Sequence, residues 1–243
     1  MRRRLRGFTL AELAVVVAII GLLLATTMFT LSAQVEQRNR SDTQRRIEEA
    51  KELLLSFALV NGRLPCPGFA SGGESGGGGA ACTNSYNGFL PATTIGFQPV
   101  DAAGFGLDAW GNRIRYVVSS ATWSAGAGRF TTAHATTAWS LSQTPADLVI
   151  CSQSPAVVAA TTCDANTSVT NQNVVVAIVF STGKNGATGG TGMNEARNLD
   201  NNQLFVSRPP DPADATGGEF DDVMVWIPVG LLYGRMIAAG VLP

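Results

Sequence analysis

The feature that most constrains this chain of 243 residues is an apolar run near its N-terminus. No charged residue occurs from Leu13 to Val35, and residues 14–28 read AVVVAIIGLLLATTM. About 20 apolar residues in an α-helix span the hydrocarbon core of a bilayer. The run is apolar on every side, unlike a helix on the surface of a soluble domain. We therefore expect residues 8–35 to form a transmembrane helix.

Basic residues gather just before this run. Four arginines precede the first acidic residue, Glu12; they are Arg2, Arg3, Arg4 and Arg6. By the positive-inside rule, such a cluster predicts a cytoplasmic N-terminus and an exported remainder. A cleaved secretory signal is disfavoured, because the apolar run is long and no A-x-A-like site follows it.

Composition excludes several classes of function. A net charge of -1 is not that of a basic nucleic-acid-binding protein. His134 is the only histidine, so His-based metal sites and His-dependent catalytic triads are not expected. No serine lies in a G-x-S-x-G sequence, and nothing selects Asp101 and Asp108 as a catalytic carboxylate pair. We therefore do not expect an enzyme.

The residues Gly7-Phe8-Thr9-Leu10-Ala11-Glu12, between the basic leader and the apolar run, resemble the cleavage motif of type IV pilins and type II secretion pseudopilins. The resemblance implies that prepilin peptidase removes residues 1–7 by cutting after Gly7, and that the new N-terminal Phe8 is N-methylated. It implies a role in assembly for Glu12. An acid in an apolar segment needs a partner, and the ammonium of Phe8, from the same or a neighbouring subunit, can supply one.

A second helical pattern follows the apolar run. Residues 36–46 are polar on all sides, and from Ile47 apolar residues recur at helical spacing through Ala50, Leu54 and Phe57 or Ala58. We expect residues 36–61 to form a periplasmic amphipathic helix that packs this stripe against a sheet. Asn61-Gly62, with Pro65 soon after, predicts its end.

The resemblance implies an α+β, pilin-like fold. Its long N-terminal α-helix, half of it transmembrane, would pack on an antiparallel β-sheet in a head of residues 62–243 with long loops. Residues 108–112, DAWGN, resemble the element that precedes the sheet in major pseudopilins, and Trp110 is expected to anchor the core. Further patterns predict strands at 114–118, 130–141 and 148–151, a buried strand at 173–180, a flexible loop at 71–80 and a short helix at 231–242.

The four cysteines predict disulfides. In an exported domain an even number of cysteines reads as a disulfide framework, and three pairings are open. Cys66–Cys82 and Cys151–Cys163 are favoured because each pair would close a short, otherwise loose loop. Zinc binding by all four is the alternative, although neither pair has C-x-x-C spacing.

The Gly-rich segment 181–195, STGKNGATGGTGMNE, resembles the calcium loop of major pseudopilins. It is not a phosphate-binding P-loop, because Asn185 follows Lys184 where Ser or Thr is required. The resemblance implies a calcium site at Asn185, Asn194, Glu195 and Asp200, although few of these are acids. A flexible turn without any cofactor is the alternative. Residues 221 and 222, both Asp, would add ligands or only solvate a turn.

These patterns predict a structural subunit of a type IV pilus-like or type II secretion pseudopilus filament. The implied partners are prepilin peptidase, other pilin subunits, an inner-membrane assembly platform and the lipid bilayer, with no nucleic acid. The chain would cross the inner membrane once and expose a periplasmic head before entering the filament. Two alternatives remain open: a minor pilin acting as an adhesin or substrate-binding module, and a lone membrane-anchored periplasmic binding protein.

Overall fold

The structure is a computed structural model of the whole chain. It describes residues 9–76, 82–122, 130–133, 146–157, 160–188 and 192–242, and it leaves the side chains of residues 24–32 undescribed. Predictions for Gly7, Phe8, His134 and the greater part of the strand at 130–141 lie outside these residues. The chain divides into two compact units, Met1–Ser41 and Asp42–Pro243, which we describe separately.

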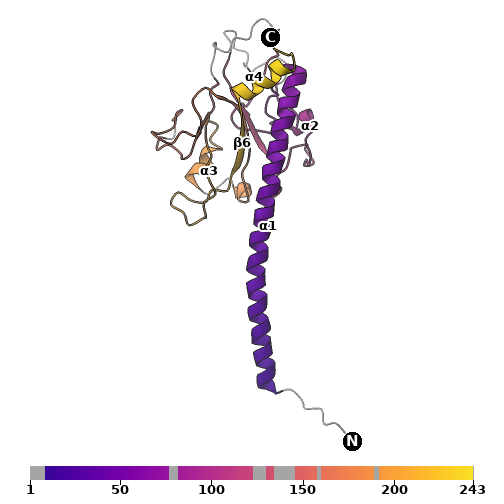
Figure 1. Cartoon of the computed structure of the whole chain (residues 1–243), viewed down its shortest axis with the longest axis vertical. Coiled ribbons are helices and arrows are strands. Elements are labelled where there is room, and N and C mark those ends of the chain that lie inside the picture. Colours follow the sequence, from indigo (N-terminus) through magenta and orange to yellow (C-terminus); the bar gives the residue numbers. More distant parts are fainter. Residues whose placement is uncertain are drawn as a thin grey trace. The chain divides into compact units, whose positions relative to one another are not determined.

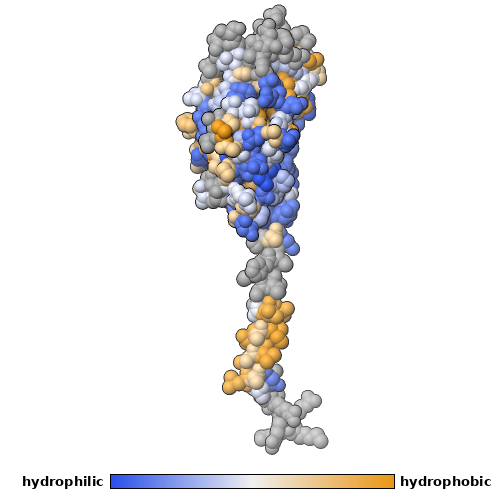
Figure 2. Space-filling view, turned by 90° about the vertical axis from the view of Figure 1, so that its left-hand side faces the viewer, coloured by the Kyte–Doolittle hydropathy of each residue, from blue (hydrophilic) through white to orange (hydrophobic). Residues whose placement is uncertain are grey.

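The first unit contains the start of helix α1, which as a whole extends from Leu10 to Asn61. Its apolar side chains are exposed to solvent, and Figure 2 shows them as a hydrophobic surface. The large ones are Leu10, Leu13, Val15, Val16, Val17, Ile19, Ile20, Leu22, Leu23 and Val35. In the described part of the chain, no helical stretch combines the length and the apolarity that crossing a bilayer would need. A transmembrane role for residues 8–35 therefore stays a prediction.

In the second unit, the remainder of α1 packs on the core through the stripe that the sequence predicts. Ile47, Ala50, Leu54 and Ala58 are fully buried. The helix ends at Asn61, as predicted. Gly62 follows with a φ of 65°, and its N–H donates to the Ala58 carbonyl at 2.9 Å. This left-handed residue turns the chain away from the helix.

An antiparallel sheet of four strands, in the order β1-β2-β4-β6, forms the centre of this unit (Figure 1). Its strands are β1 (Gly88–Phe89), β2 (Arg115–Val118), β4 (Val175–Ser181) and β6 (Val223–Pro228). Every residue of β4 is buried, because alternate side chains face two different clusters. Val179 packs in the cluster that contains Leu54 of α1, and Ile178 packs with Phe205 on the other face. The predicted buried strand and the expected α+β arrangement are both confirmed.

A second, parallel sheet pairs β3 (Val149–Cys151) with β5 (Leu204–Val206). The sequence predicted a strand at the position of β3 but not β5. Three short helices complete the described elements: α2 (Ala92–Ile95), α3 (Met193–Arg197) and α4 (Val229–Ala238), together with a single 3₁₀ turn, η1 (Gly186–Thr188). The expected C-terminal helix is α4, which buries Leu232, Tyr233 and Met236.

The prediction of a flexible loop at 71–80 is wrong for its described residues, 71–76. The Gly72 N–H donates to the Ala103 carbonyl, and the Gly72 carbonyl accepts from Thr93. A side chain at position 72 would place its Cβ 1.6 Å from the Gly104 oxygen, so only glycine permits this backbone approach. The segment is packed because its glycines fit against a neighbouring turn.

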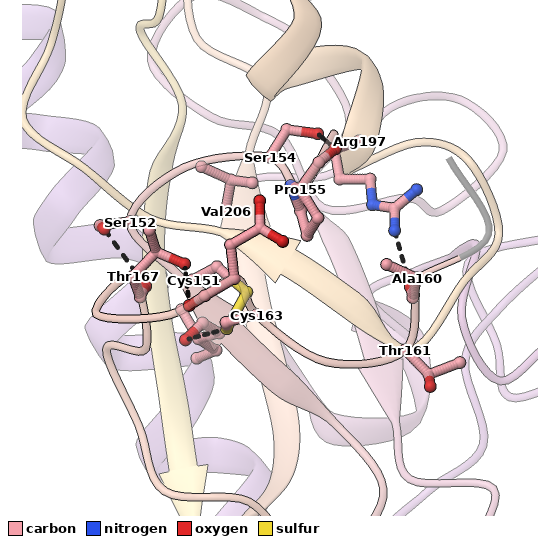
Figure 3. Close-up of a disulfide and its surroundings, with 12 residues drawn as sticks. Cys151, Ser152, Ser154, Pro155, Ala160, Thr161, Cys163, Thr167, Arg197 and Val206 are labelled. Carbon is pink, nitrogen blue, oxygen red and sulfur yellow. Dashed lines mark hydrogen bonds between the residues drawn. A yellow bond between two sulfur atoms is a disulfide. The ribbon is translucent and has the colours of Figure 1, made fainter. Parts of the chain in front are cut away.

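Both disulfides form with the predicted pairing, Cys66–Cys82 and Cys151–Cys163. Each closes a loop, of 16 and 12 residues in sequence separation respectively. Figure 3 shows the second bridge beneath the loop that contains Ser152, Ser154 and Pro155. Cys151 lies in β3 and is fully buried, so this disulfide ties the loop directly to the smaller sheet.

Candidate functional site

Thr9 and Glu12 form a closed set of hydrogen bonds at the start of α1. The backbone N–H and the hydroxyl of Thr9 both donate to Glu12 Oε2 at 2.9 Å, and the Glu12 N–H donates to Thr9 Oγ1 at 3.3 Å. This is a capping box, in which each side chain satisfies a backbone donor of the other residue. The T-x-x-E spacing was the signal for it in the sequence, and Thr9 is a residue that our sequence analysis missed.

Three acids from distant parts of the chain meet at one end of the larger sheet. Glu195 lies in α3, and Asp221 and Asp222 directly precede β6. One carboxylate oxygen from each residue lies within 4.8 Å of the others. All three residues are buried. The antiparallel register pairs Ser181 with Val223, so it brings the residues that follow β4 beside those that precede β6.

Burial of this acidic cluster disfavours its charged state. Removal from water raises the pKa of Asp222 to about 8, and the nearby charges of Glu195 and Asp221 add to the effect. Burial likewise raises the pKa of Asp221 to about 6, with a further contribution from the charge of Glu195. Carboxylates packed this closely resist joint ionisation unless a cation neutralises them.

Asn185 places its side-chain amide beside Glu195 of the acidic cluster. Its Nδ2 donates to both oxygens of Glu195, at 3.1 and 3.0 Å. Its Oδ1 is buried and has no hydrogen-bond partner in the described part of the chain, and the same is true of Asp221 Oδ1. Oxygen atoms are the ligands that calcium prefers. The three clustered carboxylates and these two unpartnered oxygens are therefore a donor set of the kind that a hard divalent cation takes.

The other two residues that the sequence suggested as ligands have different contacts. Asn194 Oδ1 accepts a hydrogen bond from the Ser154 N–H at 2.8 Å. Asp200 forms an ion pair with Arg197 at 2.9 Å. The structure thus brings Asn185 together with Glu195 and places Asn194 and Asp200 outside the acidic cluster.

The acids weighed as a catalytic pair have structural contacts of their own. Asp101 forms an ion pair with Arg113 at 2.7 Å. Asp108 Oδ2 accepts a hydrogen bond from the Ser181 hydroxyl at 2.6 Å. Trp110, in the same turn as Asp108, is half-buried and packs against the core, as expected. These contacts give residues 108–112 a role in packing.

Comparison with known proteins identifies the N-terminal segment. Residues 2–28 match the model of a family described as the prokaryotic N-terminal methylation motif. No curated protein and no solved structure matches the chain. The matched segment contains Gly7, Phe8 and Glu12, the residues on which the resemblance in the sequence rested. The chain therefore carries a prepilin-type N-terminal methylation motif, which is consistent with the type IV pilin and pseudopilin family.

Proposed function

We propose that this chain is a structural subunit of a type IV pilus-like or type II secretion pseudopilus filament. The observation that carries the proposal is the methylation motif at residues 2–28, which overlaps the first part of α1, a helix of 52 residues. Prepilin peptidase would remove residues 1–7, and Phe8 would become the methylated N-terminus. Residues 8–35 would anchor the subunit in the inner membrane and later pack in the filament. Residues 36–61 and 62–243 would form its periplasmic part.

The exposed apolar side chains of the first unit support a role in helix packing. Leu13, Ile20 and Leu22 are each at least half exposed, and in a filament their surface would be covered by the same helix of neighbouring subunits. Among the described atoms, and apart from the backbone of its own helix, nothing lies within 4 Å of the position of a Cβ on Gly21, so a neighbouring backbone has room to approach there.

Glu12 would act in assembly through its charge. In the isolated chain its carboxylate accepts from Thr9. Cleavage after Gly7 creates an ammonium group on Phe8, and a charge enclosed among apolar helices is costly unless it is paired. Glu12 of the same or an adjacent subunit would supply the opposite charge.

Mass spectrometry of the protein purified from its host membrane tests the processing. The expected product begins at Phe8 and carries one added methyl group. A product that retains residues 1–7 in cells with an active prepilin peptidase would overturn the proposed function.

Substitutions at Glu12 test the assembly role. Glu12→Gln keeps an oxygen acceptor for Thr9 and removes the charge, whereas Glu12→Ala removes both. If charge pairing drives assembly, both variants are processed normally and both enter sheared filaments poorly. Glu49→Ala, which removes an exposed acid elsewhere on α1, is the matched control and is expected to assemble normally. Normal filament content for Glu12→Gln would exclude the charge-pairing role.

We also propose that the second unit binds a divalent cation of the calcium class. Asn185, Glu195, Asp221 and Asp222 would hold it, and the bound ion would neutralise the repulsion among the three carboxylates. Calorimetric titration of the full chain in detergent micelles with calcium is expected to show one site. Asp222→Asn should abolish the heat of binding, and Asp200→Asn, outside the acidic cluster, should leave it unchanged. Loss of binding in Asp200→Asn but not in Asp222→Asn would refute this set of ligands.

A further inference from the structure

The loop that follows β4 is held from outside the acidic cluster by Asn112. Asn112 lies in the turn of residues 108–112 and is half-buried. Its Nδ2 donates to the Gly183 carbonyl at 2.6 Å. This contact joins two residues that are 71 positions apart in the sequence. Gly183 lies two residues before Asn185.

The other side of Gly183 is fixed by Ser181. The Gly183 N–H donates to Ser181 Oγ at 3.1 Å, and the Ser181 hydroxyl in turn donates to Asp108 Oδ2 at 2.6 Å. Both polar backbone groups of Gly183 are therefore bonded to side chains, one from the turn and one from a residue that the turn orients. This leaves the loop little freedom to rotate.

Gly183 is also the point at which the loop meets Asp221. It has a φ of 62°, and a Cβ there would lie 1.9 Å from Asp221 Oδ1. The next two backbone amides, of Lys184 and Asn185, donate to Asp221 Oδ2 at 2.8 and 3.3 Å. The position of Gly183 thus sets how closely Asn185 and Asp221 approach each other.

The turn of residues 108–112 is itself fixed by hydrogen bonds, both within the turn and to α1. Asp108 Oδ1 accepts from the backbone N–H groups of Trp110 and Asn112, at 2.9 and 2.8 Å. The Ala109 N–H donates to the buried Thr43 Oγ1 of α1 at 3.1 Å. Hydrogen bonds therefore connect α1 with the acidic cluster through this turn.

We propose that Asn112 is a positioning residue for the cation site: by holding the Gly183 carbonyl it keeps the Asn185 side-chain amide beside Glu195 and the Asn185 backbone N–H on Asp221. This inference rests on the cation site proposed above. Asn112 is the last residue of the DAWGN sequence, and the packing of Trp110 does not require an asparagine there. Partners that orient metal ligands in this way typically change metal affinity by about 10- to 100-fold when they are removed.

The test uses the full chain in detergent micelles with calcium and with Tb³⁺, a luminescent ion that prefers the same oxygen ligands. Asn112→Ala removes the donor to Gly183. The dissociation constant for calcium is expected to rise at least about tenfold. In Asn112→Ala, the luminescence lifetime of bound Tb³⁺ in H₂O should become shorter relative to its lifetime in D₂O. The reason is that about one water molecule would take the place of the Asn185 oxygen on the ion. A general loss of stability would not change the number of waters on a bound ion.

Two further variants separate the positioning effect from others. Asn84→Ala is the matched control, because it removes a similar amide-to-carbonyl bond, from Asn84 Nδ2 to the Asn87 carbonyl at 2.7 Å, away from the acidic cluster. It should leave both readouts unchanged. Asn112→Asp keeps the shape of the side chain and places a carboxylate against the Gly183 carbonyl; it should weaken binding as Asn112→Ala does. Should Asn112→Ala not fold, Asn112→Asp carries the test.

The outcomes distinguish the two proposals. If wild-type protein binds neither calcium nor Tb³⁺, the cation site is wrong and the role of Asn112 falls with it. If wild-type protein binds, Asp222→Asn does not, and both Asn112 variants bind like wild type with an unchanged Tb³⁺ lifetime, the cation site stands and the positioning inference is overturned.

Discussion

Arg63 and Glu74 form a two-point ion pair just after the end of α1, with both nitrogen-to-oxygen distances at 2.8 Å. Glu74 Oε2 also accepts from the Cys66 N–H at 3.2 Å, and the Arg63 guanidinium lies 5.2 Å from the centre of the Phe57 ring. Parallel double contacts of this kind are the strongest geometry for an arginine and a carboxylate. The pair therefore holds residues 66–74 against the end of the helix.

Replacing Glu74 should destabilise the second unit in a pH-dependent way. The hydrogen bonds from Arg63 hold the pKa of Glu74 below its ordinary value of 4.5. The stabilisation is therefore complete above that ordinary value and disappears as the pH falls through the lower folded-state pKa. Glu74→Gln is expected to cost about 2 kcal/mol at pH 7.

The difference between wild type and Glu74→Gln should shrink steadily as the pH falls below about 4.5. Thermal unfolding followed by near-ultraviolet circular dichroism at several pH values measures it. Glu49→Gln, an exposed acid on α1, should differ from wild type by less than about 0.5 kcal/mol throughout. A pH-independent difference for Glu74→Gln would contradict the ion-pair explanation.

Gly72→Ala should destabilise the protein because the new methyl group has no space. Its Cβ would lie 1.6 Å from the Gly104 oxygen and 2.0 Å from the Gly104 carbonyl carbon, and backbone atoms cannot rotate away as a side chain does. We expect a loss of about 1–3 kcal/mol or more, measured by urea unfolding. Gly230→Ala in α4, where no described atom outside the neighbouring helix backbone lies within 4 Å of the Cβ position, should be neutral or stabilise the helix by up to about 1 kcal/mol.

Removing the Cys151–Cys163 bridge should lower the free energy of unfolding by roughly 3 kcal/mol, because it closes a loop of 12 residues in sequence separation. The double variant Cys151→Ala, Cys163→Ala avoids leaving thiols in the core. Oxidised wild type provides the comparison, because a reductant would also open Cys66–Cys82. Equal unfolding midpoints for the double variant and oxidised wild type would show that the bridge contributes nothing.

Thr9→Ala should loosen the first turn of α1, because it removes the hydroxyl of the capping box. The expected cost is about 1 kcal/mol, seen as faster amide hydrogen exchange at residues 10–13 of the micelle-bound chain. Thr9→Ser keeps the hydroxyl and should exchange like wild type. Identical exchange in the alanine variant would mean that Glu12 does not need Thr9 at the helix start.

The parts of the fold that repeat a period over many residues could be predicted from the sequence. The stripe through Ile47 and Leu54 identified the buried side of α1, and the continuous apolar run identified β4. Strand β5 (Leu204–Val206) was not recognised, although it is as short and as completely buried as β3, which was, so three apolar residues are too weak a pattern to decide either case. The composition of residues 71–76 suggested mobility, whereas what decides their structure is a close approach to Gly104.

The candidate cation site could likewise be predicted from the sequence only in part. Asn185 and Glu195 lie in one Gly-rich segment, so the resemblance to a calcium loop was sufficient to name them. Asp221 and Asp222, which the sequence left open as added ligands or as solvation of a turn, lie more than 20 residues away and join the acidic cluster through the register of β4 with β6. Asn194 and Asp200 are close in sequence, but their side chains hydrogen-bond Ser154 and Arg197 instead. Neighbourhood in sequence was therefore a poor guide to which oxygens converge.

The Cys66–Cys82 bridge has a consequence for how this protein responds to proteases. Any single cut between these two cysteines would leave the two fragments covalently joined. The fragment that holds α1 and the fragment that holds the sheet would migrate together on a gel until a reductant separated them. A chain nicked in this loop would therefore keep α1 attached to the rest of its fold.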